Sequence, residues 1–278
     1  MFAEKILPLD LWVSNFVDWL VTNYRGFFQA IKWPVERTLE GFDHGLNWIH
    51  PAVVIVLFAF AAWKFSGKGL AFFTVIALVL IGVLGFWSDT MTTLAMVLAS
   101  VVFCAGVGVP LGIASGRSDK VEQGLRPLLD AMQTTPSFVY LVPVVMLFSV
   151  GNVAGVLATI IFAMPPIIRL TSLGIRQVHP ELVEAALAFG ATNGQVLRKV
   201  QVPLAMPTIL AGLNQTIMMA LAMVVIASLI GAGGLGAPVI LGLNTLDIGL
   251  AVIAGVSIVL LAMILDRVTQ SMAAKPGK

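Results

Sequence analysis

Charged residues are scarce in this sequence. Asp, Glu, Lys and Arg make up 11% of its 278 residues, whereas hydrophobic residues make up 59% and the mean hydropathy is +0.99. A soluble domain typically has about 25% charged residues. The composition therefore excludes an ordinary soluble domain and predicts a polytopic membrane protein. The net charge is only +2, so the chain lacks the strong positive field of a nucleic-acid-binding protein, and we expect no nucleic-acid partner.

Residues that could catalyse a reaction or bind a metal are equally few. The single cysteine, Cys104, lies in an apolar run, which excludes an intramolecular disulfide and predicts a packing role. His44 and His50 flank the start of the first apolar segment, and no set of cysteines or carboxylates accompanies them at metal-ligand spacing. We therefore predict no catalytic residue, no bound metal and no cofactor in this chain.

Two glycine motifs resemble nucleotide-binding sequences but lack the necessary context. Gly231–Gly236 contains G-x-G-x-x-G, yet it follows an apolar segment rather than a strand, so a tight loop is expected. Gly67-Lys68 would need a glycine at position 62 and Ser or Thr at position 69 to form a phosphate-binding loop. The chain has Ala62 and Gly69 instead. The chain therefore does not bind ATP by that route.

Seven apolar segments approach the length of about 20 residues that a helix needs to cross a bilayer. In chain order they are 46–63, 70–87, 91–115, 131–150, 153–168, 204–230 and 248–265. The fifth ends at Pro165-Pro166, although a kinked helix could extend beyond them. We predict an all-α fold with about seven transmembrane helices, followed by a cytoplasmic tail at 266–278.

Residues 1–45 have a different character, with a net side-chain charge of −2. Aromatic and aliphatic residues recur in this tail at roughly helical spacing: Trp12, Phe16, Trp19, Leu20, Tyr24, Phe27, Phe28 and Ile31. Such an amphipathic helix either lies in the membrane interface or packs on the transmembrane bundle as a scaffold. Pro34 is expected to end it, leaving residues 35–45 as a link to the first span.

The basic residues segregate between alternate connections of the predicted spans. Twelve of the sixteen Lys and Arg residues lie at 64–68, 117–126, 169–199 and 267–278, and the connections 88–90, 151–152 and 231–247 have none. The positive-inside rule places the basic connections in the cytoplasm. We expect a periplasmic N-terminus and a cytoplasmic C-terminus, in the bacterial inner membrane that the family resemblance below implies.

The stretch 179–203 is the longest run that looks water-soluble. Pro180 suits the first position of a helix, and Glu181 and Glu184 lie where carboxylates favour the helix dipole. Gly190 can end this helix in a left-handed conformation. Thr192 and Gln195 have the spacing of a capping box, which predicts a second short helix before Pro203. We expect two short helices outside the bilayer, with Leu182, Ala185, Ala186 and Phe189 on one apolar face of the first.

The pattern Glu184-Ala185-Ala186, Gly190 and Pro203 resembles the EAA loop of the membrane subunits of bacterial ABC importers. Val200 and Val202 stand where that pattern has Ile and Leu. The resemblance extends over residues 91–265 and implies a type I ABC-importer transmembrane domain, with residues 46–90 as two peripheral helices. In that family the loop docks on the ATPase, so Glu184, Ala185, Ala186, Gly190 and Pro203 are the expected coupling residues.

Three runs look more specifically like the quaternary-amine permeases, which carry glycine betaine, proline betaine, carnitine or choline. They are Gln133–Ser137, Pro165–Arg169 and Gly231–Gly236. The aromatic, acidic tail is most similar to the choline branch. The resemblance implies ATP-driven import across the bacterial inner membrane by alternating access, with choline as the expected solute and glycine betaine or proline betaine as alternatives. It also implies a second copy of this chain, two copies of a cytoplasmic ATPase that bind ATP and Mg²⁺, and a periplasmic substrate-binding protein as partners.

The predicted spans contain almost no ionisable residue near their centres. Ion-coupled carriers need such residues to bind a proton or sodium ion, so the energy is expected to come from a partner. The alternative is a secondary carrier or channel for a small solute that no ATPase drives. Phe138 and Tyr140, after the break at Pro136, are candidates for the translocation path, with packing or lipid contact as the alternative.

Overall fold

The computed structural model describes residues 9–274, and within this range every regular element is a helix. In chain order the elements are α1 (Leu9–Asn23), α2 (Arg25–Trp48), α3 (Pro51–Ser66), α4 (Lys68–Val83), α5 (Trp87–Arg117), α6 (Asp119–Thr134), η1 (Ser137–Tyr140), α7 (Leu141–Phe148), α8 (Asn152–Arg176), α9 (Pro180–Ala188), α10 (Asn193–Val196), η2 (Leu197–Gln201), α11 (Val202–Ala227), η3 (Ser228–Ile230), α12 (Gly236–Thr245) and α13 (Ile248–Ala274). The predicted all-α class is confirmed. Residues 1–8 and 275–278 lie outside the described range.

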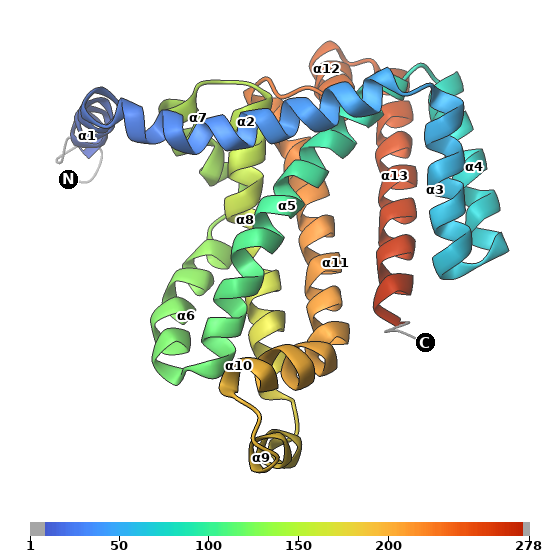
Figure 1. Cartoon of the computed structure of the whole chain (residues 1–278). Coiled ribbons are helices and arrows are strands. Elements are labelled where there is room, and N and C mark those ends of the chain that lie inside the picture. Colours follow the sequence, from blue (N-terminus) through green and yellow to red (C-terminus); the bar gives the residue numbers. More distant parts are fainter. Residues whose placement is uncertain (1–8, 275–278) are drawn as a thin grey trace, which may run out of the picture.

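The long helices α5, α8, α11 and α13 form the body of the molecule, while α1 and α2 run across one end of it (Figure 1). The short helices α9 and α10 project at the opposite end, near the turn from α5 into α6 (Figure 1). The turn from α3 into α4 and the end of the described range of α13 face the same way but lie closer to α2. The described parts of the four basic connections therefore lie on the side of the fold away from α2.

Between residues 9 and 274, four helical segments are long and apolar enough to cross a membrane, and the number rises to six if two bent helix pairs each count as one span. The predicted single span 131–150 is wrong. Instead, α6 and the η1–α7 segment meet at 106°. Proline disfavours helical backbone at the residue before it, and Thr135 is extended there, with φ −73° and ψ 127°. Pro136 therefore accounts for the break.

The helices α3 and α4 form a hairpin at the side of the bundle, consistent with a peripheral pair (Figure 1). Gly67 joins them with a φ of +105°, so the glycine-lysine pair belongs to a tight turn. Each helix has 16 residues, or about 24 Å at 1.5 Å per residue, which is less than the roughly 30 Å hydrocarbon core. Neither helix alone meets the length expected of a span, and the described residues show four to six spans instead of the predicted seven.

Pro34 does not end the N-terminal helix, contrary to the prediction, because α2 continues through it to Trp48. The apolar side chains of Val35 and Leu39 are buried, at 3% and 5% exposure, within the core that includes α5. Burying a Val or Leu contributes about 1.5–3 kcal/mol, and two such residues offset the roughly 3 kcal/mol cost of an internal proline. The expected link 35–45 is therefore helical.

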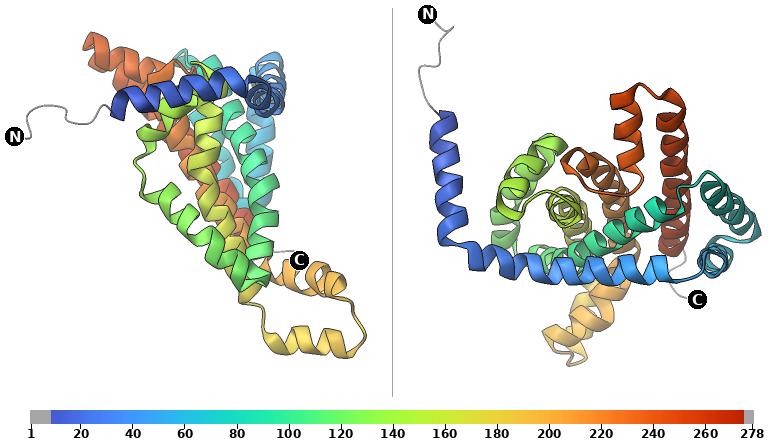
Figure 2. Two further views of the ribbon diagram at one scale, coloured as in Figure 1. Left: turned by 90° about the vertical axis from the view of Figure 1, so that its left-hand side faces the viewer. Right: turned by 90° about the horizontal axis from the view of Figure 1, so that it is seen from above.

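Polar contacts reinforce the position of α2. The Thr92 hydroxyl of α5 donates to the Asp43 carboxylate at 2.9 Å. Helix α2 therefore packs on the bundle through both apolar and polar contacts. Helix α1 differs, since it leaves Trp12, Phe16 and Trp19 more than half exposed. It makes an angle with α2 when seen from above (Figure 2). Its placement in the membrane interface stays a prediction.

Two other helices are longer than expected. Helix α8 passes through Pro165 and Pro166 and ends at Arg176, so Arg169 and Arg176 lie on its last turns rather than in a loop. Helix α13 continues beyond residue 265 to Ala274, so most of the expected tail at 266–278 is helical. Both extensions are held by polar contacts with neighbouring helices: Arg169 and Arg176 bind α6, and Asp266 and Thr269 bind Asn214 of α11.

The glycine-rich loop at 231–236 is a compact turn packed on the starts of α5 and α8. Gly231 has a φ of +77°, the Gly233 N–H donates to Asn152 Oδ1 at 2.7 Å, and the Leu235 N–H donates to Thr93 Oγ1 at 2.8 Å. No strand precedes it within the described chain, which agrees with the prediction of a tight loop. The sequence analysis missed α12, which occupies most of the expected loop 231–247.

The closest helix contact in the body lies between α5 and α8. Glycines recur every fourth residue on α5 and face α8 side chains with the same spacing. The glycines are Gly108, Gly112 and Gly116, and the facing residues are Ile167, Thr171 and Ile175. A Cβ atom on Gly112 would lie 2.5 Å from Thr171 Cβ and 2.7 Å from the Ile168 carbonyl oxygen. This repeat lets the two backbones approach closely, as small residues do in membrane proteins.

We predict that Gly112→Ala destabilises the fold, because its methyl group must displace α8 backbone. Overpacking of this kind costs about 1–3 kcal/mol. The measurement is the midpoint of thermal unfolding in detergent. Gly106→Ala on the same helix is the matched control, since a Cβ there meets nothing within 4 Å. Equal midpoints for the two variants would show that the close contact does not hold the bundle together.

Candidate functional site

The water-soluble stretch forms a compact helical segment between α8 and α11. We call residues 179–203 the projecting segment, because it extends beyond the ends of the long helices (Figures 1 and 2). Helix α9 starts at Pro180 with His179 as its N-cap residue, and Glu181 lies in its first turn. Proline at the first position has no N–H to leave unsatisfied, which fixes the start of the helix.

Gly190 closes α9 through its backbone. Its φ is +82°, its N–H donates to the Leu187 carbonyl at 2.9 Å, and the Ala191 N–H donates to the Ala186 carbonyl at 3.0 Å. This pair of bonds is a Schellman motif, which satisfies carbonyl groups that a helix end leaves free. The predicted left-handed glycine is confirmed. A Cβ at Gly190 would meet nothing within 4 Å, so the backbone angle, and not crowding, requires glycine.

The second short helix starts with the predicted capping box. Gln195 N–H donates to Thr192 Oγ1 at 3.4 Å, and the Thr192 N–H donates to Gln195 Oε1 at 2.8 Å. The chain then widens into a π-helical turn at Leu197–Gln201 before α11. Pro203 offers a reason, since proline cannot donate to the carbonyl four residues earlier and its ring clashes with it. Pro203 thereby shapes the entry into α11.

Helix α9 carries an apolar face that the rest of the described chain leaves open. It contains no buried residue, Leu182 and Leu187 are 46% and 43% exposed, and Phe189 is 93% exposed. Glu184 and Ala185 are exposed as well. Exposed Phe and Leu on a short helix outside the apolar bundle favour a protein partner.

The projecting segment is held firmly where it joins the bundle. Val178 before α9 and Val196 in α10 are buried, at 9% and 3% exposure. The end of α8 and the start of α11, which flank the segment, pack closely against each other. A Cβ on Gly174 would lie 3.2 Å from both the Cβ and the carbonyl oxygen of Ala205. A displacement of α9 would therefore move the ends of α8 and α11 together.

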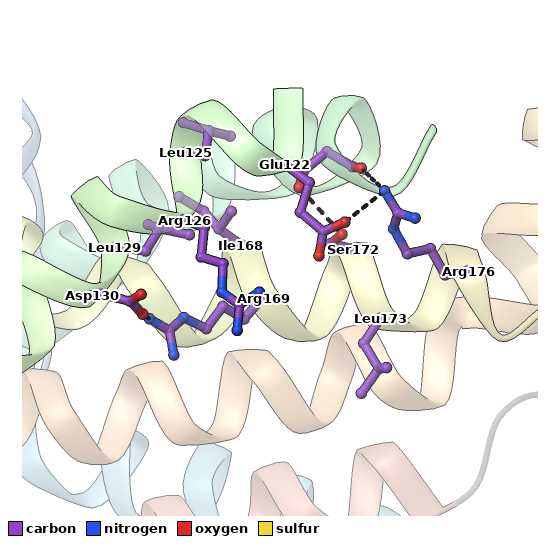
Figure 3. Close-up of a pocket in the computed structure, with 11 residues that line it drawn as sticks. Glu122, Leu125, Arg126, Leu129, Asp130, Ile168, Arg169, Ser172, Leu173 and Arg176 are labelled. Carbon is purple, nitrogen blue, oxygen red and sulfur yellow. Dashed lines mark hydrogen bonds and ion pairs between the residues drawn. The ribbon is translucent and has the colours of Figure 1, made fainter. Parts of the chain in front are cut away.

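Arg176, the last residue of α8, connects this junction to two further helices. Its guanidinium donates to Asp119 and to Glu122 of α6, each at 2.7 Å, and to the Ser115 carbonyl of α5 at 2.9 Å. Figure 3 shows the contact with Glu122. Arg176 lies only four residues before Pro180. The sequence analysis did not single out this cluster. The only sign of this cluster in the sequence is the group of charged residues after the third apolar segment. Arg176 and its partner Asp119 are more than fifty residues apart, so no local pattern links them.

The two candidates for a translocation path have different surroundings. Tyr140 is partly buried, its hydroxyl donates to the Met132 carbonyl at 2.7 Å, and its ring centroid lies 6.3 Å from that of Phe162. This contact stabilises the bend between α6 and α7. Phe138 is 60% exposed at the same bend. Phe138 is thus available to a solute or to lipid, whereas Tyr140 has a packing role within the chain.

The helical bundle with its projecting segment is the fold of a type I ABC-importer permease. A chain of an inward-facing structure of the MetNI methionine ABC transporter aligns with a TM-score of 0.59 and 24% identity, over 67% of this chain and 93% of that one. Residues 108–275 match the family described as the inner membrane component of binding-protein-dependent transport systems, and the chain belongs to that family. It is thus a multi-pass inner-membrane transport subunit.

Two permeases align with nearly the whole of this chain. The glycine betaine/proline betaine permease ProW of Escherichia coli is 55% identical over 98% of this chain and 77% of its own length. The glycine betaine permease OpuAB of Bacillus subtilis is 47% identical over 97% of this chain and 95% of its own length. A glycine betaine/carnitine/choline permease of Bacillus subtilis, OpuCB, is 34% identical over 62% of this chain. The quaternary-amine group is therefore the nearest context, and the choline branch is not specifically supported.

We predict that Gly190→Val weakens binding of the partner ATPase while leaving membrane insertion intact. A β-branched residue is a true outlier at positive φ. Holding valine in the left-handed conformation that ends α9 costs about 1–2 kcal/mol. The measurement is the amount of ATPase retained by the purified permease at equal membrane abundance. Gly190→Asn is the control, because asparagine adopts this conformation more readily. Undiminished retention by the valine variant would contradict a role for this helix end.

Proposed function

We propose that this chain is the permease of an ATP-driven importer that carries glycine betaine or proline betaine into the cell. The projecting segment is the observation that carries the proposal. It supplies a short helix with a defined end and an open apolar face, at the end of the bundle where basic connections gather. The names of ProW and OpuAB, which mention glycine betaine, point to the solute.

The proposed complex has two copies of this chain, two copies of a cytoplasmic ATPase and a periplasmic substrate-binding protein. ATP and Mg²⁺ bind to the ATPase, which performs the hydrolysis. Helix α9 lies on the cytoplasmic side, and Glu184, Ala185 and Ala186 face the ATPase. With this orientation the N-terminus is periplasmic and the C-terminus is cytoplasmic, as the positive-inside rule favours.

Movement of the ATPases would reach the membrane through the junction described above. A pull on α9 acts on α8 and α11 at the Gly174–Ala205 contact, and Arg176 extends the movement to α5 and α6. The permease would then alternate between inward-open and outward-open states. Phe138 offers the passing solute an aromatic face, and cation–π attraction suits the permanently charged quaternary ammonium group of that solute.

Choline is a second candidate solute, because the acidic, aromatic tail resembles the choline branch. Glycine betaine is favoured over choline, since the relative named for choline matches a smaller part of this chain at lower identity. A secondary carrier or channel, the other alternative, is not favoured, since the chain belongs to a family that works with a binding protein.

We predict ATP-dependent uptake of radiolabelled glycine betaine by vesicles that contain the permease, its ATPase and its binding protein. Uptake should stop without ATP, and unlabelled glycine betaine should compete better than choline. Vesicles with the permease alone, under a proton or sodium gradient, are the control. Uptake by these control vesicles at the rate of the full system would support the secondary-carrier alternative and contradict our proposal.

A further inference from the structure

A pocket between α6 and α8 has no assigned ligand in the function proposed above, which uses only its lining residue Arg176. It has a volume of about 400 Å³ and lies at the end of the bundle where α5 turns into α6 (Figures 1 and 3). Arginine side chains from both helices form its polar side, and leucine and isoleucine form the other. The polar side includes Arg126, Arg169, Arg176 and Ser172, and the apolar side consists of Leu125, Leu129, Ile168 and Leu173.

The positive charges of the pocket are unequally matched. Arg176 contacts two carboxylates, and Arg169 donates through one terminal nitrogen to Asp130 at 2.5 Å. Arg126 extends from α6 toward α8 (Figure 3), and no carboxylate contacts it in the described part of the chain. A guanidinium has five N–H donors, so Arg126 and the remaining donors of Arg169 can bind an additional anion.

A quaternary ammonium group does not fit this pocket. No aromatic side chain lines it within the described residues, and its two carboxylates, Glu122 and Asp130, already contact arginines. A cation would therefore meet Arg126 without a compensating charge or an aromatic face. An anion is favoured in this pocket, since guanidinium groups bind phosphate well.

The apolar side of the pocket distinguishes a lipid from a soluble anion. Leu129 and Ile168 are buried at its base, at 5% and 2% exposure, and Leu173 is 44% exposed beside them. A phosphate ion gains nothing from such a surface, whereas the start of an acyl chain is removed from water there. Basic pockets between transmembrane helices on the cytoplasmic side are suited to the headgroups of anionic lipids.

We propose that this pocket binds the phosphate of an anionic phospholipid such as phosphatidylglycerol. Arg126 and Arg169 contact the phosphate, and Leu125 and Leu173 contact the adjoining part of the acyl chain. The bound lipid would fill the space between α6 and α8, two helices that Arg169 and Arg176 otherwise join through exposed ion pairs. Exposed ion pairs contribute only about 0–1 kcal/mol each, so a bound lipid would add substantially to this contact.

The test compares lipid binding by the purified permease–ATPase complex and its variants, measured by native mass spectrometry after removal of endogenous lipid. Arg126→Gln should weaken binding of phosphatidylglycerol about tenfold, since one charge-assisted contact of roughly 1.5 kcal/mol is lost. Lys120→Gln is the matched control, because Lys120 is an exposed cation on the same helix outside the pocket. It should bind phosphatidylglycerol like the unaltered protein. Phosphatidylcholine, which has no net charge, should bind weakly to all three.

Three results would overturn the proposal. The first is equal phosphatidylglycerol binding by Arg126→Gln and the unaltered complex. The second is displacement of the lipid by inorganic phosphate at the same concentration, which would show a site for a soluble anion. The third is an Arg126→Gln complex that contains a different number of permease copies from the unaltered complex but binds the same amount of lipid. This result would show that a second copy of the permease covers the pocket. Each result leaves the proposed transport function standing, since uptake is measured separately.

Discussion

The close approach of α5 and α8 determines where the rest of the molecule can lie. In a bilayer, apolar side chains gain little by moving from lipid to protein, so helix contacts depend on packing and on polar groups. The glycines of α5 allow its backbone to reach the Ile168 carbonyl and Thr171 of α8 at distances that no side chain would permit. This contact brings the Ser115 carbonyl within reach of Arg176. The ion-pair cluster at the start of the projecting segment is therefore a consequence of the glycine repeat.

The projecting segment solves a different problem, which is to remain ordered outside the bundle without a core of its own. Its ends are fixed by backbone chemistry: proline at the start of α9, a left-handed glycine at its end, and a capping box before α10. Hydrogen bonds at the helix ends are formed within the segment itself. Leu182 and Phe189 therefore stay exposed and can contact a partner. A helix that is ordered before it binds loses little conformational entropy on association.

The features that could be predicted from the sequence are those whose cause is local. The apolar runs gave the helical class, Gly190 gave the end of α9, and Thr192 with Gln195 gave the capping box. The errors concern features that depend on distant residues. Pro34 lies inside a helix because Val35 and Leu39 pack in the core formed with α5. The cluster around Arg176 joins residues that are remote in sequence, and no local pattern predicts which partner an arginine will choose.

A direct measurement of the central claim, that α9 contacts the ATPase, is site-specific photocrosslinking. A photoreactive amino acid replaces Phe189, which is 93% exposed on the projecting segment, and a second variant carries it at Leu246, which is 85% exposed. Leu246 directly follows α12, and this helix lies at the other end of the bundle (Figure 1). We expect light to produce a covalent adduct with the ATPase from position 189 and none from position 246. Transport-competent complexes that yield no adduct from position 189, or equal amounts from both positions, would contradict the account.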